Sequence, residues 1–223
     1  MENNVTDRFI WNHASNPHGV LLLTHGAGLL MDAPFMERVT KALVEVGITV
    51  ARFEFGYMAK RRRTGKKAPP PRADKLCVEF LHVIEALAEH DELPRNIPLL
   101  IGGKSMGGRI AAMVASNELL DIAVRGIVCL GYPFHPQGKS EPEFWRLETL
   151  QQSILPVLIC QGERDAFGWW DEIDPIELPE QVQIKWITDG SHDLGPTGKS
   201  PATMKSNVAD AANHVEVFAR TLA

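Results

Sequence analysis

The sequence predicts an α/β protein with a doubly wound, mostly parallel sheet that helices cover on both faces. Short apolar runs alternate along the chain with longer segments of helical periodicity. Parallel neighbours require crossover connections, which helices supply. Unbroken apolar runs are typical of strands buried on both faces. We therefore expect ligand-binding residues in the loops that follow the C-terminal ends of the strands.

Six segments are predicted as core strands because each is short, aliphatic or β-branched, and bounded by Gly, Pro or polar residues. They cover residues 20–24, 49–53, 99–102, 126–130, 157–161 and 182–187. Apolar periodicity predicts helices over 34–46, 76–87, 106–116 and 208–222. Two stretches dense in Pro, Gly and charge, 59–72 and 131–143, are predicted as loops near the mouth of a site.

The bulk composition is that of one ordinary globular domain spanning residues 1–223. Of the 223 residues, 44% are hydrophobic and 23% charged, and the formal net charge of -5 argues against a surface built to bind nucleic acid. The three cysteines lack the spacing of metal ligands. With no signal peptide or membrane span in the sequence, we expect a cytoplasmic protein.

A Gly-x-Ser-x-Gly motif, Gly103-Lys104-Ser105-Met106-Gly107, lies between a predicted strand and a predicted helix. In this context the serine occupies a sharp, strained turn, and small residues on either side avoid clashes. The hydroxyl of Ser105 would then project above the sheet, beside the free N–H groups of the helix. Ser105 is the candidate nucleophile.

The motif has two other interpretations. Gly103-Lys104-Ser105 resembles the end of a phosphate-binding loop, but Pro98 replaces the first glycine of that motif. The residues between are an apolar strand rather than a flexible loop. The other alternative is a glycine-rich turn without chemistry. The strand-turn-helix context favours the nucleophile over both.

A serine hydroxyl needs a base, and the base needs an acid that orients it. In this arrangement both follow the serine along the chain, each after a separate strand. Asp165 follows the fifth predicted strand and the turn at Gly162, so it is the candidate acid. Glu163, Asp171 and Asp174 are neighbouring competitors.

His192 is the candidate base, because it lies in the turn directly after the sixth predicted strand and before the last helix. Of the other histidines, His25 precedes Ser105 and belongs to another turn, and among those after Ser105 only His135 also lies on a loop after a strand. We expect His135 to line the pocket instead.

Negative charge on the carbonyl oxygen of a substrate is normally stabilised by two backbone N–H groups. Met106, directly after the nucleophile, is predicted to supply one. The loop His25-Gly26-Ala27-Gly28, after the first strand, is predicted to supply the other from Ala27, with Gly28 as the second choice.

Six Lys and Arg residues lie between positions 60 and 67. The acidic balance of the whole chain favours a solvated loop, or a rim that attracts an anionic small-molecule substrate, over a nucleic-acid or membrane surface. Arg52, His135 and Gly28 are the candidate substrate-binding residues. Arg52, at a strand end, could instead pair with a structural carboxylate.

Seven motifs together are similar to one group of proteins over most of the chain: Thr24-His25-Gly26-Ala27-Gly28, Arg52-Phe53-Glu54-Phe55, Arg61-Arg62-Arg63, Gly103-Lys104-Ser105-Met106-Gly107-Gly108-Arg109, Gly131-Tyr132-Pro133-Phe134-His135-Pro136, Gln161-Gly162-Glu163-Arg164-Asp165 and Gly190-Ser191-His192-Asp193. The chain resembles small members of the α/β-hydrolase superfamily related to dienelactone hydrolases and to the testis-expressed and NSL-complex hydrolase-like proteins. This resemblance implies the α/β-hydrolase fold with a minimal lid.

The resemblance also implies a serine, acid and histidine site at Ser105, Asp165 and His192. Dienelactone hydrolases proper use a cysteine nucleophile, whereas this sequence has serine, which argues against dienelactone chemistry. We expect a carboxylesterase-like serine hydrolase that cleaves an ester or thioester of a small substrate, without a metal or organic cofactor. The alternative is a hydrolase-fold scaffold or regulatory protein that binds without catalysis.

Overall fold

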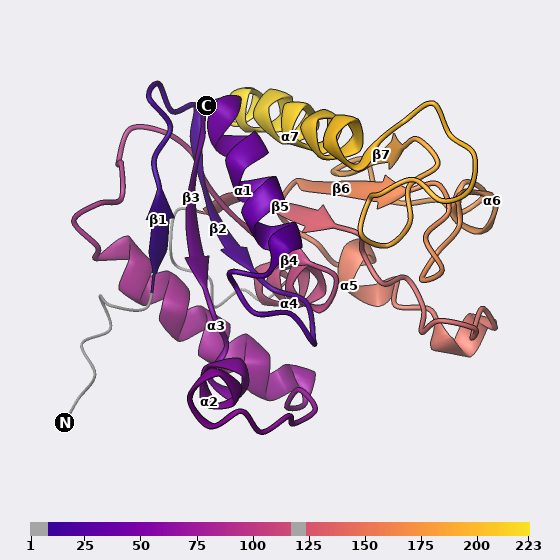
Figure 1. Cartoon of the computed structure of the whole chain (residues 1–223), viewed down its shortest axis with the longest axis horizontal. Helices are drawn as coiled ribbons and strands as arrows, with labels where there is room; N and C mark the ends of the chain where they lie inside the picture. The colour runs from indigo at the N-terminus through magenta and orange to yellow at the C-terminus, as the bar shows by residue number, and fades with distance from the viewer. Residues whose placement is uncertain (1–8, 117–123) are drawn as a thin grey trace.

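The computed structural model describes residues 9–116 and 124–223. Seven strands form one sheet in the order β1-β3-β2-β4-β5-β6-β7 (Figure 1). They span Ile10–Asn12 (β1), Gly19–Thr24 (β2), Ile48–Phe53 (β3), Leu99–Lys104 (β4), Val124–Leu130 (β5), Val157–Gly162 (β6) and Val182–Ile187 (β7). All neighbours pair in parallel except β1, which runs antiparallel to β3. The predicted doubly wound, mostly parallel sheet is confirmed.

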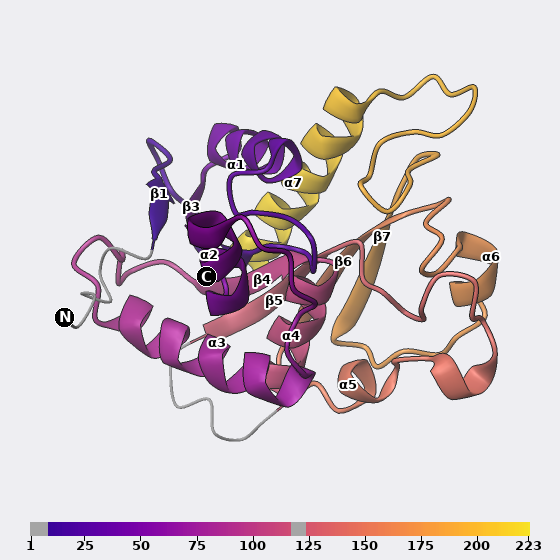
Figure 2. The same ribbon diagram turned by 60° about the horizontal axis from the view of Figure 1, so that its bottom comes forward.

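Helices cover both faces of this sheet (Figures 1 and 2). They span Pro34–Glu45 (α1), Gly56–Thr64 (α2), Ala73–Ala88 (α3), Met106–Ala115 (α4), Glu148–Gln151 (α5), Trp170–Ile173 (α6) and Met204–Thr221 (α7), with a 3-10 turn at Pro142–Phe144 (η2). Helices α1 and α7 pack on one face, and α3 and α4 on the other. None of the helices in the described ranges is long and apolar enough to cross a membrane.

Alternate residues of each central strand face opposite helix layers. In β2, Val20 and Leu22 pack toward α3 and α4, whereas Leu21 and Leu23 pack toward α1 and α7. All four side chains are completely buried. A strand buried on both faces requires an unbroken apolar run, and the sequence has one.

The segment 59–72, predicted as a loop, is in part a helix, because α2 continues to Thr64. Its C-terminus is a left-handed glycine, Gly65, with a φ of 69°. Only Met58 of this helix is buried, so no apolar stripe marks it in the sequence. Its basic side chains instead bond to distant parts of the chain, as described below.

The C-terminal ends of β4, β5, β6 and β7 lie at one edge of the sheet. Parallel pairing aligns the last residues of these strands, as with Gly162 opposite Ile187 and Lys104 opposite Leu130. The loops that leave the strands therefore meet at this edge, where ligand sites form in open parallel sheets.

Candidate active site

Ser105 occupies the strained turn between β4 and α4. Its backbone has φ 52° and ψ −115°, a conformation that is rare for a residue with a side chain. The turn is also crowded, because a Cβ on Gly103 would lie 2.6 Å from the Thr24 carbonyl oxygen. A Cβ on Gly107 would lie 2.7 Å from the carbonyl oxygen of His25. Glycine at both positions thus lets the turn pack against the loop after β2.

Asp165 and His192 form a buried acid and imidazole pair. His192 Nδ1 lies 2.8 Å from Oδ2 of Asp165, whose side chain is fully buried. The carboxylate also accepts Nε2–H of Gln161 at 2.9 Å and the N–H of Phe167 at 2.9 Å. A carboxylate only accepts, so Nδ1 carries the proton and Nε2 of His192 is left as a base.

The loops that carry the acid and the base touch through their backbones. A Cβ on Gly162 would lie 2.3 Å from the carbonyl oxygen of Gly190 and 2.5 Å from that of Ser191. The N–H of Arg164 also donates to the Gly190 carbonyl at 2.8 Å. Glycine at position 162 is therefore needed for the contact between these two loops.

The loop after β5 links this pair to the serine. The N–H of Ser105 donates to the carbonyl of Leu130 at 3.1 Å. The next residue, Gly131, has φ 69°, and a Cβ there would lie 3.2 Å from His192 Nδ1. Ser105 and His192 thus pack against successive residues of one turn.

The Ser105 hydroxyl and the His192 imidazole make no hydrogen bond in the described part of the chain. Contacts between a nucleophile and its base are often long until substrate is bound. The acid–base contact is therefore formed here, whereas the base–nucleophile contact is not.

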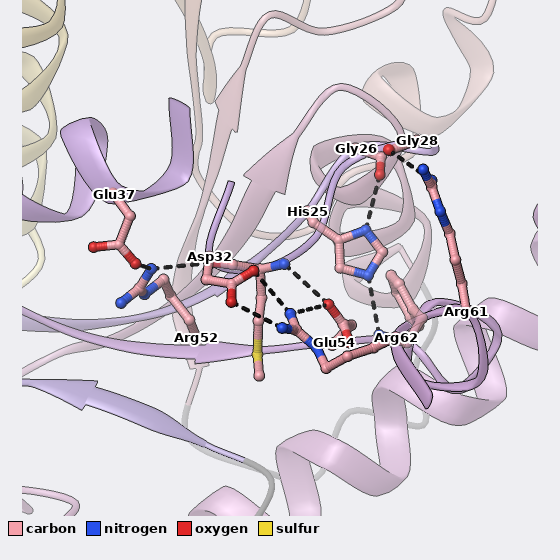
Figure 3. A network of polar contacts seen from close by, with 11 residues as sticks. His25, Gly26, Gly28, Asp32, Glu37, Arg52, Glu54, Arg61 and Arg62 are labelled. Atoms are coloured by element: carbon pink, nitrogen blue, oxygen red, sulfur yellow. Dashed lines mark hydrogen bonds and ion pairs between the residues drawn. The ribbon is translucent and has the colours of Figure 1, made fainter. Parts of the chain in front are cut away.

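The loop after β2 has three consecutive carbonyl groups that are held by side chains. His25 bonds to the Gly26 carbonyl at 2.8 Å, and Arg61 donates to that of Gly28 at 3.1 Å (Figure 3). Between them, the Tyr57 hydroxyl donates to the carbonyl of Ala27 at 2.8 Å. In residues 9–116 and 124–223, the N–H groups of Ala27 and Met106 donate to no protein acceptor. Two candidate oxyanion donors are thus unpaired.

Helix α2 anchors this loop through two arginines. Arg62 binds Asp32 with two hydrogen bonds of 2.8 Å and also binds Glu54, which in turn accepts the N–H of Met31 (Figure 3). The hydrogen bond from Arg62 lowers the pKa of Asp32. Paired guanidinium and carboxylate groups of this kind are geometrically specific. The basic segment therefore has a structural role in addition to its exposed charges.

His25 is buried and uses both ring nitrogens. Nε2 accepts the N–H of Phe55 at 3.1 Å, so Nδ1–H is the donor to the Gly26 carbonyl. Burial lowers the pKa of His25 below 6.5. A proton on Nε2 would also displace the Phe55 N–H, so the loop requires a neutral imidazole.

We predict that this histidine makes the fold sensitive to acid. Its folded-state pKa is below the unfolded value of 6.5, so between the two values the unfolded chain binds more protons. The free energy of unfolding should therefore fall as the pH falls below about 6.5. Urea denaturation across pH 7.5 to 5.5, an interval chosen around that value, measures this slope. It should become shallower in His25→Gln but not in His82→Gln, whose side chain is exposed; equal slopes in all three proteins would contradict the prediction.

The three candidate substrate-binding residues lie apart. Gly28 is exposed beside Ala27. Arg52 is 3% exposed and binds Glu37 (Figure 3). It also donates to the Met31 carbonyl and to Asn12, and these contacts favour a structural role for Arg52. His135 is 3% exposed and lies 3.3 Å from Glu172. Only Gly28 is therefore open to a ligand in this conformation.

The competing acids and the competing base either have other partners or are exposed to solvent. Glu163 accepts the N–H of Asp189 at 2.8 Å. Asp171 and Asp174 are exposed near α6, and His135 bonds to the Pro136 carbonyl. The geometry thus brings together Asp165 and His192 rather than any of these alternatives.

Two polar residues of this site were not predicted. Gln161, fully buried at the end of β6, joins the carboxylate of Asp165 to the backbone of Tyr132. Lys104, 1% exposed at the end of β4, donates to the carbonyl of His192 at 2.6 Å. A polar residue at the end of an apolar strand is the signal that could have found both.

No three His, Cys, Asp or Glu side chains in the described ranges could hold a metal ion. A surface hollow of about 790 Å³ lies beside the first residues of β2, β4 and β5, at the opposite edge of the sheet from Ser105. The groups capable of acid–base chemistry described above are therefore remote from that hollow.

Solved structures share this fold at low sequence identity. A dienelactone hydrolase from Anabaena variabilis superposes with a TM-score of 0.63 and 17% identity, covering 91% of this chain and 88% of its own. An esterase from Pyrococcus furiosus gives a TM-score of 0.66 and 16% identity over 96% and 85%. A serine hydrolase without a lid from Xanthomonas campestris gives 0.63 and 17% over 92% and 84%.

The family comparison covers nearly the whole chain. The family model described as alpha/beta hydrolase domain matches residues 17–220, which include every strand from β2 to β7. The strained turn at Ser105 and the pair formed by Asp165 and His192 lie within this match. The chain belongs to the alpha/beta hydrolase domain family.

Proposed function

We propose that this protein is a carboxylesterase-like serine hydrolase that cleaves an ester or thioester of a small substrate through Ser105, His192 and Asp165. The observation that carries the proposal is the buried contact of 2.8 Å between His192 Nδ1 and Asp165, which leaves Nε2 as a base. The strained Ser105 and this pair pack against successive residues of the loop after β5, Leu130 and Gly131. Strain of this kind is often stored at functional sites.

In the proposed reaction, His192 Nε2 accepts the hydroxyl proton as Ser105 Oγ attacks the carbonyl carbon. The N–H groups of Met106 and Ala27 stabilise the oxyanion. Collapse of this intermediate expels the alcohol or thiol, which takes the proton from His192. Water then attacks the acyl group on Ser105, again with His192 as base, and releases the acid.

We infer from the seven motifs that the protein is related to the dienelactone-hydrolase-like branch with testis-expressed and NSL-complex relatives, with serine in place of the cysteine nucleophile. An anionic substrate is favoured by the exposed cations of the basic segment, Lys60, Arg63, Lys66 and Lys67. Arg61, in the same segment, donates to the carbonyl of Gly28, so a further positive charge lies beside Ala27, the proposed oxyanion donor.

Hydrolysis of p-nitrophenyl esters of short and long acids tests the proposal. Release of p-nitrophenol should show a burst of one equivalent per chain followed by steady turnover, because an acyl-enzyme accumulates. Esters whose acyl group carries a carboxylate should be preferred over neutral esters of equal length. Absence of both burst and turnover on all esters would favour a scaffold that binds through this fold without catalysis.

Tyr57 provides a test of the loop after β2, His25-Gly26-Ala27-Gly28, which we call the oxyanion loop. Its hydroxyl donates to the Ala27 carbonyl and lies 3.9 Å from Met106 Sδ, so it contacts both residues that supply donors. Burial raises its pKa to about 12, which keeps it a donor. We expect Tyr57→Phe to lower kcat roughly tenfold with little change in KM, since full loss of an oxyanion donor costs about 10² to 10³.

Tyr132→Phe is the matched control for Tyr57→Phe. The Tyr132 hydroxyl donates to the Arg146 carbonyl at 2.9 Å, away from Ala27. Steady-state kinetics of the two variants should therefore differ. Equal kcat values for the parent and Tyr57→Phe would show that the Tyr57 hydroxyl does not support the oxyanion loop.

A further inference from the structure

Lys104 is a buried cation between the serine turn and the base loop. Its side chain is 1% exposed, and Nζ donates to the His192 carbonyl at 2.6 Å. Nζ also lies 3.3 Å from Oδ1 of Asp193 and 5.4 Å from the centre of the Phe35 ring. The residue that follows it is Ser105. A single side chain thus connects the strand end that carries the serine to both residues at the tip of the base loop.

We propose that Lys104 is a positioning residue of the active site, whose ammonium fixes the backbone of His192 relative to Ser105. The proposal rests on the proposed function. It accounts for a contact that spans 88 positions of the chain. The lysine of the Gly103-Lys104-Ser105 sequence therefore serves the base loop, whereas in a nucleotide-binding loop it would face a phosphate.

The surroundings of Lys104 disfavour its charge. Burial lowers its pKa to about 8, while the carboxylates of Asp193 and Asp165 act in the opposite direction. From α1 it meets only the Phe35 ring among the described contacts, and from the loop after β5 it meets Gly131, close to His192 Nδ1. A buried ammonium of this kind destabilises the fold relative to an apolar side chain of similar size. A residue kept for packing alone would not need the charge.

Lys104→Met separates positioning from stability. Methionine has a similar length and no charge, so thermal unfolding should occur at the parental temperature or above it. We expect kcat for p-nitrophenyl esters to fall by up to about 10²-fold with KM nearly unchanged, the size of effect that small misplacements produce. Lys185→Met is the matched control, because Lys185 is exposed on strand β7 of the same sheet. Parental kcat in Lys104→Met, or a variant that unfolds, would overturn the proposal.

The pH dependence gives a second readout. The parental rate should fall as the pH rises through about 8, the pKa of Lys104, because the charge that holds Asp193 is lost. Asp193→Asn removes a group that raises this pKa, so the fall should move to lower pH. Lys104→Arg, which stays charged, should retain activity at alkaline pH. A fall that is identical in the parent, Asp193→Asn and Lys104→Arg would contradict the assignment.

A measurement without substrate distinguishes failure of this proposal from failure of the proposed function. The imidazole Nδ1 proton bonded to Asp165 can be followed by proton NMR through its exchange with water. Its exchange should become faster in Lys104→Met but not in Lys185→Met. Unchanged exchange in Lys104→Met overturns the role of Lys104 even if the parent hydrolyses no ester. If the parent hydrolyses no ester but exchange is faster in Lys104→Met than in the parent, the role of Lys104 is supported while the proposed function fails.

Discussion

Substitution of Ser105 by alanine is expected to lower kcat for ester hydrolysis by on the order of 10⁶-fold, as removal of a triad serine does in a serine protease. No other hydroxyl can replace it, because the reacting group must lie at the turn that begins α4. Residual turnover would come from the oxyanion donors and substrate binding alone. Steady-state kinetics measures the loss, with circular dichroism as a check on folding.

Ser116→Ala is the control for this variant. Ser116 follows α4, and its hydroxyl donates to the Met113 carbonyl at 2.9 Å, one helix length from Ser105. Its removal should leave kcat unchanged. Turnover in Ser105→Ala within tenfold of the parental value, a margin of about 1.4 kcal/mol in activation free energy, would mean that another group performs the attack.

Asp165→Asn is expected to lower kcat by about 10⁴-fold while the fold is retained. The amide would present an N–H group to Nδ1 of His192, which then carries no proton, so Nε2 is protonated and cannot act as base. The amide oxygen then takes the place of Oδ1 and still accepts the N–H of Phe167. Gln161, which donates to the same oxygen as His192, loses that acceptor but keeps the carbonyls of Tyr132 and Gly168. The loss should appear in kcat rather than in KM.

Asp171→Asn and Asp174→Asn are matched controls, because both aspartates are exposed near α6. Each should leave kcat at the parental level. A large loss in either one, with Asp165→Asn active, would move the role of the acid to that residue.

Local patterns were enough to predict the sheet and the serine turn. The six predicted core strands correspond to β2 through β7, because a strand buried on both faces needs an apolar run that can be seen in the sequence. The turn at Ser105 needs glycine at two fixed positions, and these are also visible. Strand β1 was missed, since its three residues are ordered by antiparallel pairing with β3, about 40 positions away.

Helix α2 and the contacts within the site depend on distant partners. Arg62 stabilises α2 by bonding to Asp32, 30 positions away, and no apolar periodicity accompanies this contact. Lys104 meets His192 only after β4 and β7 take their places in the sheet. Arg52 and His135 are buried and lie against Glu37 and Glu172, carboxylates that the sequence does not identify as their partners. The order of residues along the chain and their places at strand ends are enough to predict the triad candidates. Which side chains pair with one another can be seen only in the folded structure.

Labelling with a fluorophosphonate followed by peptide mass spectrometry tests the central claim most directly. Such probes bond to a serine whose hydroxyl is activated by a base. We predict one adduct per chain, on Ser105, formed rapidly in the parent and not at all in Ser105→Ala. An adduct on a different residue, or an intact parental chain that forms no adduct, would contradict the claim that Ser105, His192 and Asp165 act together.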